Sequence, residues 1–463
     1  MSDPETVLAA AGAAVGRALA QRRGDRVATP LTESALKTAL EAYDFAAPLP
    51  LERVVPELIH LLRNFAVRSD HPRYFGLFNP PALLPAIAGD LVAAAINPQL
   101  AVWSHAPAAA EIERKLIRLF GSLVWSDVQA AGTFTSGGSE ANHTALLAAL
   151  ARCDPSWDRD GVRAHARRPA IYASAESHLA WIKIARMCGL GSDAVRLVPT
   201  KDGLQMTGDA LARAIAADSS CAPVMVVATA GTTAHGSIDD LAGIARVGRD
   251  HGAHVHVDAA WAGGALLHPD YRHLFAGIED ADSVTIDPHK WLAVPMGTGL
   301  FLARDWQPLA QAFAVSTGYM PPTSGERHDA YIHSVQWSRR FIGARLFAAL
   351  ATLGLEGYRA LIDRAFVLGN QLRARLLADH WHVLNRTDLP LVCFAPVAAD
   401  DERVRAIEQT VVASGEAWIS TVRLRRQLVL RACITSYETE AGDLDALVDV
   451  LGQGRRACGT SRS

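Results

Sequence analysis

The sequence predicts an α/β protein whose main sheet is mostly parallel. Short apolar runs alternate with helical patterns from about residue 84 to residue 302, and strands that alternate with helices usually pair in parallel, with helices on both faces. Polar residues directly follow several of these runs, and ligands bind outside the carboxyl ends of such strands. A chain of 463 residues with 50% hydrophobic composition is also long enough to bury a large core. We therefore expect a site at the carboxyl edge of the main sheet.

Residues 1–82 are expected to form helices and connectors without a sheet of their own. Val7–Arg22 is alanine-rich with helical periodicity, and Leu51–Phe65 repeats apolar residues at helical spacing. Between them, Glu33–Leu40 follows the capping residue Thr32. The apolar faces of these helices need another surface to cover them. We expect them to pack on a neighbour, such as a second subunit.

The large domain is expected in residues 83–357 and a small domain in residues 358–463. The predicted strands of the main sheet are Thr133–Phe134, Ala170–Ala173, Val224–Thr229, His254–Asp258, Ser283–Ile286 and Gly299–Ala303. The predicted elements after them are the helices Trp337–Leu353 and Gly357–Ala378, the strands Leu391–Ala395, Trp418–Arg423 and Leu428–Ile434, and the helix Ala441–Gly452. This later mixture predicts a small α+β domain with an antiparallel sheet.

Composition and charge exclude several classes of function. The net charge is −3 and no long basic run occurs, so nucleic acid is not an expected partner and a small molecule is. Asp3 and Glu5 stand where a signal peptide would be cationic, and Asp90 interrupts the longest apolar stretch, Pro80–Ile96. The six cysteines form no CxxC pair, which argues against disulfides and structural zinc. We expect a cytoplasmic protein with no membrane segment and no metal.

Lys290 has the most distinctive setting of any residue in the chain. It follows the predicted strand Ser283–Ile286, which Pro288 must end, and it is one of five lysines beside forty arginines. Because a charged ammonium is costly to bury, a lysine in such a place tends to have a lowered pKa or a covalent partner. These properties are typical of a Schiff-base lysine. The alternative is a surface lysine after a turn.

The segment Thr135–Asn142 follows the first strand and opens the predicted helix Ala141–Arg152. Gly137 and Gly138 let the backbone approach a ligand closely, and Ser139 can cap the helix and add a hydroxyl. Amide donors at a helix N-terminus make an anion site, so we predict a phosphate site here. The alternative is a plain glycine turn. No Gly-Lys-Ser/Thr follows, so the segment is not a nucleotide P-loop.

Two further groups follow predicted strands. His178 comes after Ala170–Ala173, where an imidazole can cover a planar cofactor ring and bond a substrate carboxylate. Thr232 and Thr233 come after Val224–Thr229 and are expected to face the same edge. The alternatives are a structural histidine and ordinary turn threonines.

Asp258 ends the strand His254–Asp258 and is followed by the small residues Ala259 and Ala260. A buried carboxylate is costly unless it meets a cation, and a protonated pyridine nitrogen would supply one. Asp258 and Lys290 are therefore candidates to hold opposite ends of one ring.

Together these motifs resemble the group II pyridoxal-5′-phosphate (PLP) decarboxylases, the family of aromatic-L-amino-acid, glutamate and 2,4-diaminobutyrate decarboxylases. The resemblance rests on Asp287-Pro-His-Lys-Trp291 after the segments TSGGSEAN, ESH, GTT and HVDAAWAG. It implies a fold-type I PLP-dependent transferase fold, PLP as cofactor, and a homodimer with the site between subunits. The implied activity is that of an L-amino acid α-decarboxylase, a carboxy-lyase that forms CO2 and an amine through a Schiff base on Lys290.

The resemblance also implies roles for single residues. Asp258 holds the pyridinium nitrogen, His178 stacks on the ring, and Thr233 contacts the ring's substituents. The implied cofactor-binding residues are Gly137, Gly138, Ser139, His178, Thr233, Asp258, Ala260, Asp287, His289 and Lys290. Asp287 stands where some relatives have asparagine, and Gly137 stands where some have serine.

The substrate side of the site rests on the resemblance alone. Thr317–Gln336 resembles the family's mobile catalytic loop, in which Tyr331 is the candidate proton donor to Cα and a packing role is the alternative. Leu77, Phe78 and Trp103, together with His178, are the implied substrate-binding residues. Leu77 stands where aromatic-specific relatives have tyrosine, which weakens a dopa-like substrate. Aromatic, apolar, acidic and diamino acids all remain open.

Other activities are compatible with the same residues. Substrate orientation decides which bond breaks, so a decarboxylation-dependent oxidative deaminase (aldehyde synthase) and a PLP-dependent carbon–carbon lyase are alternatives. A catalytically silent PLP-binding protein would require loss of Lys290. A nucleotide-binding protein would require a metal-binding Walker partner, which the sequence does not suggest.

Overall fold

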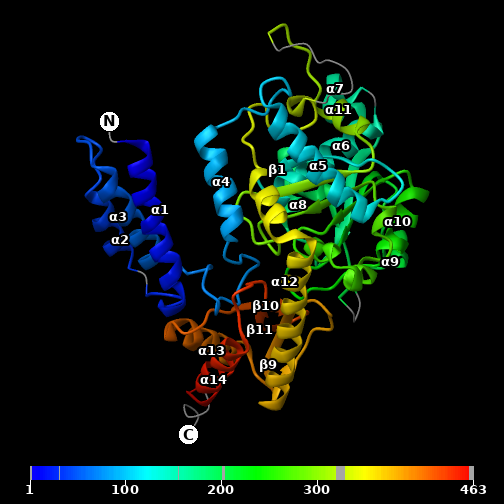
Figure 1. The fold of residues 1–463 in the computed structure, drawn as a ribbon. Helices are drawn as coiled ribbons and strands as arrows, with labels where there is room; N and C mark the ends of the chain where they lie inside the picture. The colour runs from blue at the N-terminus through cyan, green and yellow to red at the C-terminus, as the bar shows by residue number, and fades with distance from the viewer. Residues whose placement is uncertain (1–2, 31, 155, 201–203, 320–328, 458–463) are drawn as a thin grey trace. The chain divides into compact units, whose positions relative to one another are not determined.

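A computed structural model describes residues 3–30, 32–154, 156–200, 204–319 and 329–457 (Figure 1). The chain divides into two compact units. The first comprises Met1–Pro81, Val367–Asn385 and Pro390–Ser463, and the second comprises Ala82–Phe366 and Arg386–Leu389. The first unit thus combines the N-terminal segment with most of the expected C-terminal domain.

The second unit is built on a seven-stranded sheet in the order β1-β7-β6-β5-β4-β2-β3. The strands are β1 (Ala131–Thr135), β2 (Arg168–Ser174), β3 (Val195–Val198), β4 (Cys221–Thr229), β5 (His254–Asp258), β6 (Ser283–Ile286) and β7 (Gly299–Ala303). The five strands from β6 to β3 pair in parallel, whereas β7 pairs antiparallel with both of its neighbours, β6 and β1. The predicted α/β class with a mainly parallel sheet is confirmed, and only β3 was missed.

Helices cover both faces of this sheet, and β5 shows how the two faces differ. Val255, with Val226 of β4, packs against Gly248 of α10 (Leu241–Asp250). The residues that alternate with the valines of β5 face α6 (Gly138–Cys153) instead, where Asp258 bonds to Asn142. The other helices of the unit are α4 (Leu84–Ile96), α5 (Pro107–Val124), α7 (Trp157–Asp160), α8 (Ala180–Met187), α9 (Gly208–Ala216) and α11 (Gln307–Phe313). One face of β5 is therefore apolar and the other polar.

The long helix near the end of this unit begins later than predicted. Helix α12 (Ala344–Ala378) starts seven residues after Trp337 and has one non-helical residue, Gly354, with φ of +64°. Before it, the chain is held by Glu113, which accepts hydrogen bonds from Arg339 Nη2 at 2.6 Å and from Gly343 N at 2.9 Å. A buried ion pair therefore replaces the predicted first turns of the helix.

The first unit contains a four-stranded antiparallel sheet in the order β10-β11-β9-β8. Its strands are β8 (Trp381–Val383), β9 (Leu391–Pro396), β10 (Ser420–Leu424) and β11 (Gln427–Cys433), and its helices include α13 (Asp401–Ser414) and α14 (Ala441–Ala457). The predicted small antiparallel sheet is confirmed, with β8 as an additional strand. The five described cysteines are free.

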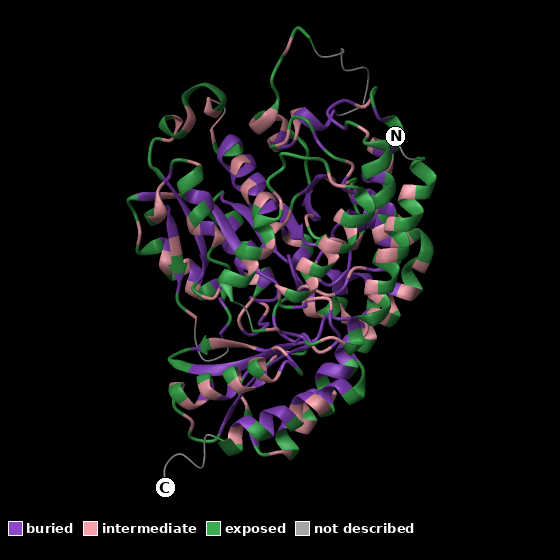
Figure 2. Cartoon of the chain, turned by 90° about the vertical axis from the view of Figure 1, so that its left-hand side faces the viewer, coloured by how far each residue is buried: buried purple, intermediate pink, exposed green. Residues whose placement is uncertain are grey.

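Helices α1 (Pro4–Gln21), α2 (Glu33–Glu41) and α3 (Leu51–Asn64) agree with the helices predicted for residues 1–82. None of their described residues is buried, in contrast to the strands of the main sheet (Figure 2). Among the described ranges, no helix is both long and apolar enough to pass through a lipid bilayer.

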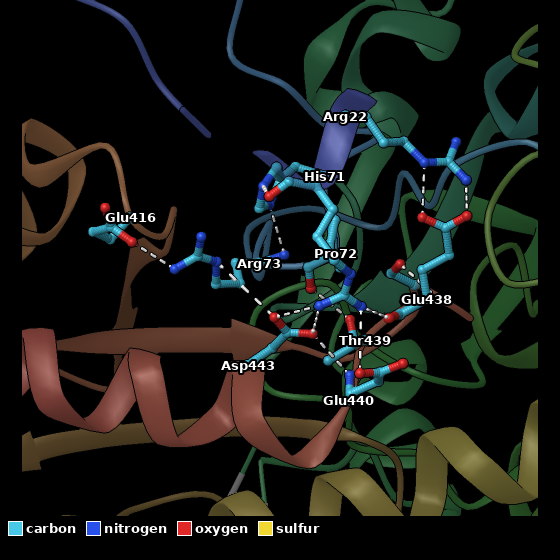
Figure 3. A network of polar contacts seen from close by, with 11 residues as sticks. Arg22, His71, Pro72, Arg73, Glu416, Glu438, Thr439, Glu440 and Asp443 are labelled. Carbon is cyan, nitrogen blue, oxygen red and sulfur yellow. Dashed lines mark hydrogen bonds and ion pairs between the residues drawn. The ribbon is translucent and has the colours of Figure 1, made fainter. Parts of the chain in front are cut away.

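A polar network ties the N-terminal segment to the start of α14 and the residues just before it, inside the first unit (Figure 3). Arg22 pairs with Glu438, and Arg23 Nη1 lies 3.1 Å from Asp443 Oδ1 at the start of α14. Thr439 Oγ1 also donates to the carbonyl of Pro72 at 2.6 Å. These long-range bonds explain why segments far apart in the sequence form one unit.

Candidate active site

The candidate site is a cavity of about 280 Å³ at the carboxyl edge of the parallel strands, lined wholly by the second unit. This volume is near the lower end of the range for small-molecule sites, about 300–1,000 Å³. All ten residues implied as cofactor-binding line it: Gly137, Gly138, Ser139, His178, Thr233, Asp258, Ala260, Asp287, His289 and Lys290. The fold brings these residues together from the ends of β1, β2, β4, β5 and β6.

Asp258 is buried at the end of β5, and both of its carboxylate oxygens have partners. Oδ2 accepts a hydrogen bond from Asn142 Nδ2 at 2.8 Å, and Oδ1 accepts one from the backbone N–H of Ala260 at 3.1 Å. Both donors are neutral, so the carboxylate is held in one orientation and its charge stays uncompensated. It is suited to bind a cationic ring nitrogen.

Lys290 lies beside a second buried carboxylate, that of Asp287. Lys290 Nζ is 3.1 Å from Asp287 Oδ2, and His289 Nε2 is 3.8 Å from the same oxygen. Burial raises the pKa of the Asp287 carboxyl, while Lys290 and His289 act in the opposite direction. Asp287 Oδ1 is buried with no partner among the described residues. This pair therefore presents a primary amine and an acceptor without a partner at the cavity.

The glycine segment after β1 forms one wall of the cavity. Gly137 has φ of +150°, a conformation open to glycine but rarely to other residues, and α6 begins at Gly138. A Cβ at Gly138 would lie 2.7 Å from Asp287 Oδ2, so a larger residue would force the wall apart. The first amides of α6 thus border the cavity at a helix N-terminus, an arrangement that favours an anion.

The prediction that Ser139 caps this helix is wrong. The helix begins at Gly138 rather than Ala141, its N-cap is Gly137, and no side chain makes the cap hydrogen bond. The carboxylate of Glu140 instead reaches back one turn, where Oε2 accepts from the backbone N–H of Ser136 at 2.8 Å. Ser139 lines the cavity from inside the first turn.

His178 and Thr233 line the cavity, whereas Thr232 does not. His178 Nδ1 accepts a hydrogen bond from the backbone N–H of Ala180 at 3.1 Å, so the neutral ring carries its proton on Nε2. Thr232 is fully buried, and its Oγ1 lies 3.0 Å from His235 Nδ1. The expectation that both threonines face the site therefore holds for Thr233 alone.

The four residues implied on the substrate side, other than His178, do not line this cavity in the described structure. Trp103 donates from Nε1 to Glu111 at 2.8 Å and lines a separate cavity of about 510 Å³. Tyr331 is buried, with its ring centroid 4.9 Å from that of Trp337.

Leu77 and Phe78 belong to the first unit, where Leu77 is exposed and Phe78 packs under the guanidinium of Arg431, 4.7 Å from its ring centroid. Within the segment Thr317–Gln336, residues 320–328 lie outside the described residues. The substrate-side assignments therefore stay predictions.

Two buried residues next to Asp258 were missed at the sequence level. Asn142 lies in the second turn of α6 and lines the cavity, and His256 Nε2 is 3.1 Å from Asn142 Oδ1. A signal for His256 does exist in the sequence, because alternation along His254-Val-His-Val-Asp258 places three polar residues on one face of a buried strand.

Comparison with known proteins gives a consistent result. Residues 35–397 match the family model described as the pyridoxal-dependent decarboxylase conserved domain. The chain is 27% identical over 472 residues to L-2,4-diaminobutyrate decarboxylase of Acinetobacter baumannii, covering 96% of this chain and 92% of that one. It is 32% identical over 328 residues to human cysteine sulfinic acid decarboxylase, covering 69% and 66%.

The fold is similar to that of Oryza sativa TDC, solved with PLP and tryptamine. The TM-score is 0.92 and the identity 25%, and the match covers 99% of this chain and 100% of that chain.

Proposed function

Because the chain belongs to the pyridoxal-dependent decarboxylase family, we propose that it is an L-amino acid α-decarboxylase in which Lys290 holds PLP as a Schiff base. Membership of this family makes the protein a PLP-dependent carboxy-lyase that acts on amino acids. What the proposal adds is the role of each residue, the α-carboxylate as the leaving group, and the assembly. The observation that carries it is that Lys290 and Asp258 line one cavity.

The residues of the cavity fit PLP in three respects. Lys290 supplies an amine for the aldehyde, and the buried carboxylate of Asp258 supplies a partner for a protonated ring nitrogen. The N-terminus of α6, with Gly138 and Ser139, supplies donors for a phosphate, and His289 lies on the same wall. When bound, PLP supplies an electron sink for the pair of electrons left by the departing carboxylate.

The protein's own residues then decide what this electron sink acts on. Asp258 would favour the charged form of the ring nitrogen, and its two hydrogen bonds keep the carboxylate in one orientation for that contact. His178 borders the cavity with its Nε2–H available to bind the substrate carboxylate, and orienting that group would select the bond that is cleaved. We propose that Tyr331 returns the proton to Cα and that Leu77, Phe78 and Trp103 contribute to the substrate side.

We also propose a homodimer in the cytoplasm. Helices α1, α2 and α3 have no buried residue among those described, although α3 carries the exposed apolar residues Leu58 and Leu62. A second subunit would cover such faces.

The test of the Schiff base is reduction of the loaded protein with borohydride, followed by peptide mass analysis. We expect the cofactor mass on the peptide that contains Lys290, and no such product in Lys290→Ala. Lys183→Ala, which changes an exposed lysine of α8, serves as the matched control and should label like the natural protein. Label on a different lysine would refute the proposed role of Lys290.

The reaction and the substrate class are tested together by a panel of amino acids scored separately for CO2, amine and peroxide. The relatives named above act on different side chains by name, so the panel includes aromatic, acidic and diamino acids. Decarboxylation predicts equal amounts of CO2 and amine without peroxide. Peroxide with aldehyde would indicate the oxidative deaminase, and cleavage without CO2 would indicate a carbon–carbon lyase.

Tyr331→Phe tests the proposed proton donor. Without the phenol, return of the proton to Cα would be slower and reaction with molecular oxygen could compete with it, so we expect turnover to shift from amine toward aldehyde, ammonia and peroxide. Trp337→Phe alters the ring beside Tyr331 and controls for packing. An unchanged yield of amine in Tyr331→Phe would contradict the assignment.

A further inference from the structure

A chain of buried polar groups extends from Asp258 away from the cavity. Asn142 bridges Asp258 and His256, with Nδ2 on the carboxylate at 2.8 Å and Oδ1 3.1 Å from His256 Nε2. Beyond it, Ser283 Oγ lies 2.8 Å from His256 Nδ1 and 2.7 Å from His254 Nε2. The least buried member of the chain is Asp258, which is 6% exposed. This series of hydrogen-bonded polar groups is thus almost completely shielded from water.

The direction of every hydrogen bond in this chain follows from the charge on Asp258. A carboxylate only accepts, so Asn142 must present its amide nitrogen to Asp258 and its carbonyl oxygen to His256. His256 must then carry its proton on Nε2, which leaves Nδ1 to accept from the hydroxyl of Ser283. Ser283 in turn accepts from Nε2 of His254. Burial keeps both histidines neutral, because it lowers the pKa of His254 to about 4 and that of His256 well below its usual value.

His256 is itself held rigidly in place. The ring of Trp181 in α8 meets it edge-on, with centroids 5.6 Å apart, and Thr285 Oγ1 lies 3.3 Å from the same Nε2. A flipped Asn142 amide would turn its NH2 group toward His256 Nε2–H and its carbonyl oxygen toward Asp258. Both contacts would then pair like with like, donor against donor and acceptor against acceptor. Asp258 and His256 together therefore hold Asn142 in one orientation.

We propose that Asn142 and His256 are positioning residues that hold the Asp258 carboxylate in one orientation, aimed at the cofactor's ring nitrogen. They act through Asp258. The amide N–H of Asn142 is already bonded to that carboxylate, and His256 is bonded to Asn142 on the side away from the cavity. The inference rests on the proposed role of Asp258 as the partner of PLP. It adds that the charge of the ring nitrogen depends on buried residues behind Asp258, whose hydrogen bonds all have a fixed donor and acceptor.

The experiment compares the variants His256→Phe, His256→Gln and Asn142→Leu with the control His143→Asn. His143 neighbours Asn142 on α6, is half-buried and does not line the cavity. Each full-length chain is titrated with PLP, and the absorption bands of the substrate-free loaded protein are followed against pH. Thermal unfolding of the PLP-free chain reports the loss of packing separately.

We expect His256→Phe and Asn142→Leu to weaken PLP binding by about 10- to 100-fold, the range seen when partners behind metal ligands are removed. The absorption bands should shift as the ring nitrogen loses its proton, which loss of packing alone would not cause. His256→Gln keeps an N–H donor and should recover most of the affinity and the original bands. His143→Asn should resemble the natural protein in both measurements.

Bands and affinity in the His256 and Asn142 variants that match those of His143→Asn would overturn this inference. An equal loss of PLP affinity in His256→Phe and His256→Gln would also overturn it, because a hydrogen-bonding role requires the two variants to differ. Should His256→Phe fail to fold, the comparison of Asn142→Leu with His256→Gln decides. Failure of the natural protein to bind PLP at Lys290 would instead refute the proposed function and is seen in the same titration.

Discussion

Asp258 and Asp287 end or follow neighbouring parallel strands and line the same cavity, yet they are held in opposite ways. The oxygens of Asp258 accept from two fixed neutral donors, Asn142 and the backbone of Ala260. Asp287 faces the amine of Lys290 through one oxygen, and its other oxygen has no partner among the described residues. The orientation of the Asp258 carboxylate is fixed by the fold. The charge of the Asp287 carboxylate depends on what Lys290 is bonded to.

The largest expected effect comes from Asp258→Asn. This change keeps the shape but removes the charge opposite the ring nitrogen, and preorganised electrostatic partners of this kind contribute on the order of 10²–10³-fold in rate. We expect kcat to fall by about that factor, with a changed absorption spectrum of the bound cofactor. The measurement is CO2 release with the best substrate from the amino-acid panel.

Asp250→Asn, at the exposed end of α10, is the matched control for removing one carboxylate. Turnover of Asp258→Asn within a few-fold of the control would mean that the ring nitrogen does not need a charged partner. The different environments of the two aspartates would then have no consequence for catalysis.

The same substitution at the two aspartates should change the stability of the PLP-free chain in opposite directions. Asp258→Asn turns an NH2 group toward a donor and leaves a buried N–H unsatisfied, which costs about 1–3 kcal/mol in the free energy of unfolding. Asp287→Asn removes a carboxyl group whose pKa is raised by burial, so the cost of burying its charge disappears and the free energy of unfolding increases at pH 8.

Urea unfolding of both variants beside the natural chain measures this difference in sign. The gain in Asp287→Asn should shrink as pH falls, because a raised pKa means that the natural carboxyl is already protonated in the folded chain at the lower pH. A loss of stability in both variants would indicate that Lys290 fully compensates Asp287.

The contrast between the two aspartates also marks what the sequence predicts well. Lys290, Asp258 and the glycines at 137 and 138 follow strands, and parallel strands bring their carboxyl ends to one edge, so local pattern was sufficient to bring these residues together. The contact of Asn142 with Asp258 depends on how α6 packs on β5 and on the orientation of one amide, and no local sequence pattern predicts either. His256 had a signal in the alternation of β5, but alternation does not identify its partner.

The misplaced elements have the same physical cause. The long helix was predicted from Trp337 on local preference, and the buried pair of Arg339 with Glu113 overrides that preference. Similarly, Trp103 and Tyr331 are held by contacts that join distant parts of the sequence. The backbone N–H of Trp103 donates to Asp329 Oδ1 at 2.8 Å, and that of Tyr331 donates to the carbonyl of Ala101 at 3.2 Å. Long-range polar contacts therefore explain why local sequence patterns did not predict the positions of these residues.

A third comparison concerns the two histidines behind Asp258. Their folded-state pKa values lie below the ordinary value of 6.5, with His254 at about 4. Below about pH 6.5 the unfolded chain therefore takes up protons that the folded chain cannot, and the free energy of unfolding falls as pH decreases. Each such histidine contributes a slope of about 1.4 kcal/mol per pH unit.

Comparing urea unfolding of the PLP-free chain at pH 7.5 and pH 5 tests this slope. His254→Asn should lose less stability than the natural chain between these values, by about one histidine's share, whereas His251→Asn at the exposed end of α10 should not differ from it. Asp287 works in the opposite direction, because its raised pKa favours the folded chain as pH falls. An equal loss in His254→Asn and His251→Asn would mean that the buried histidines behind Asp258 take up protons without cost in stability.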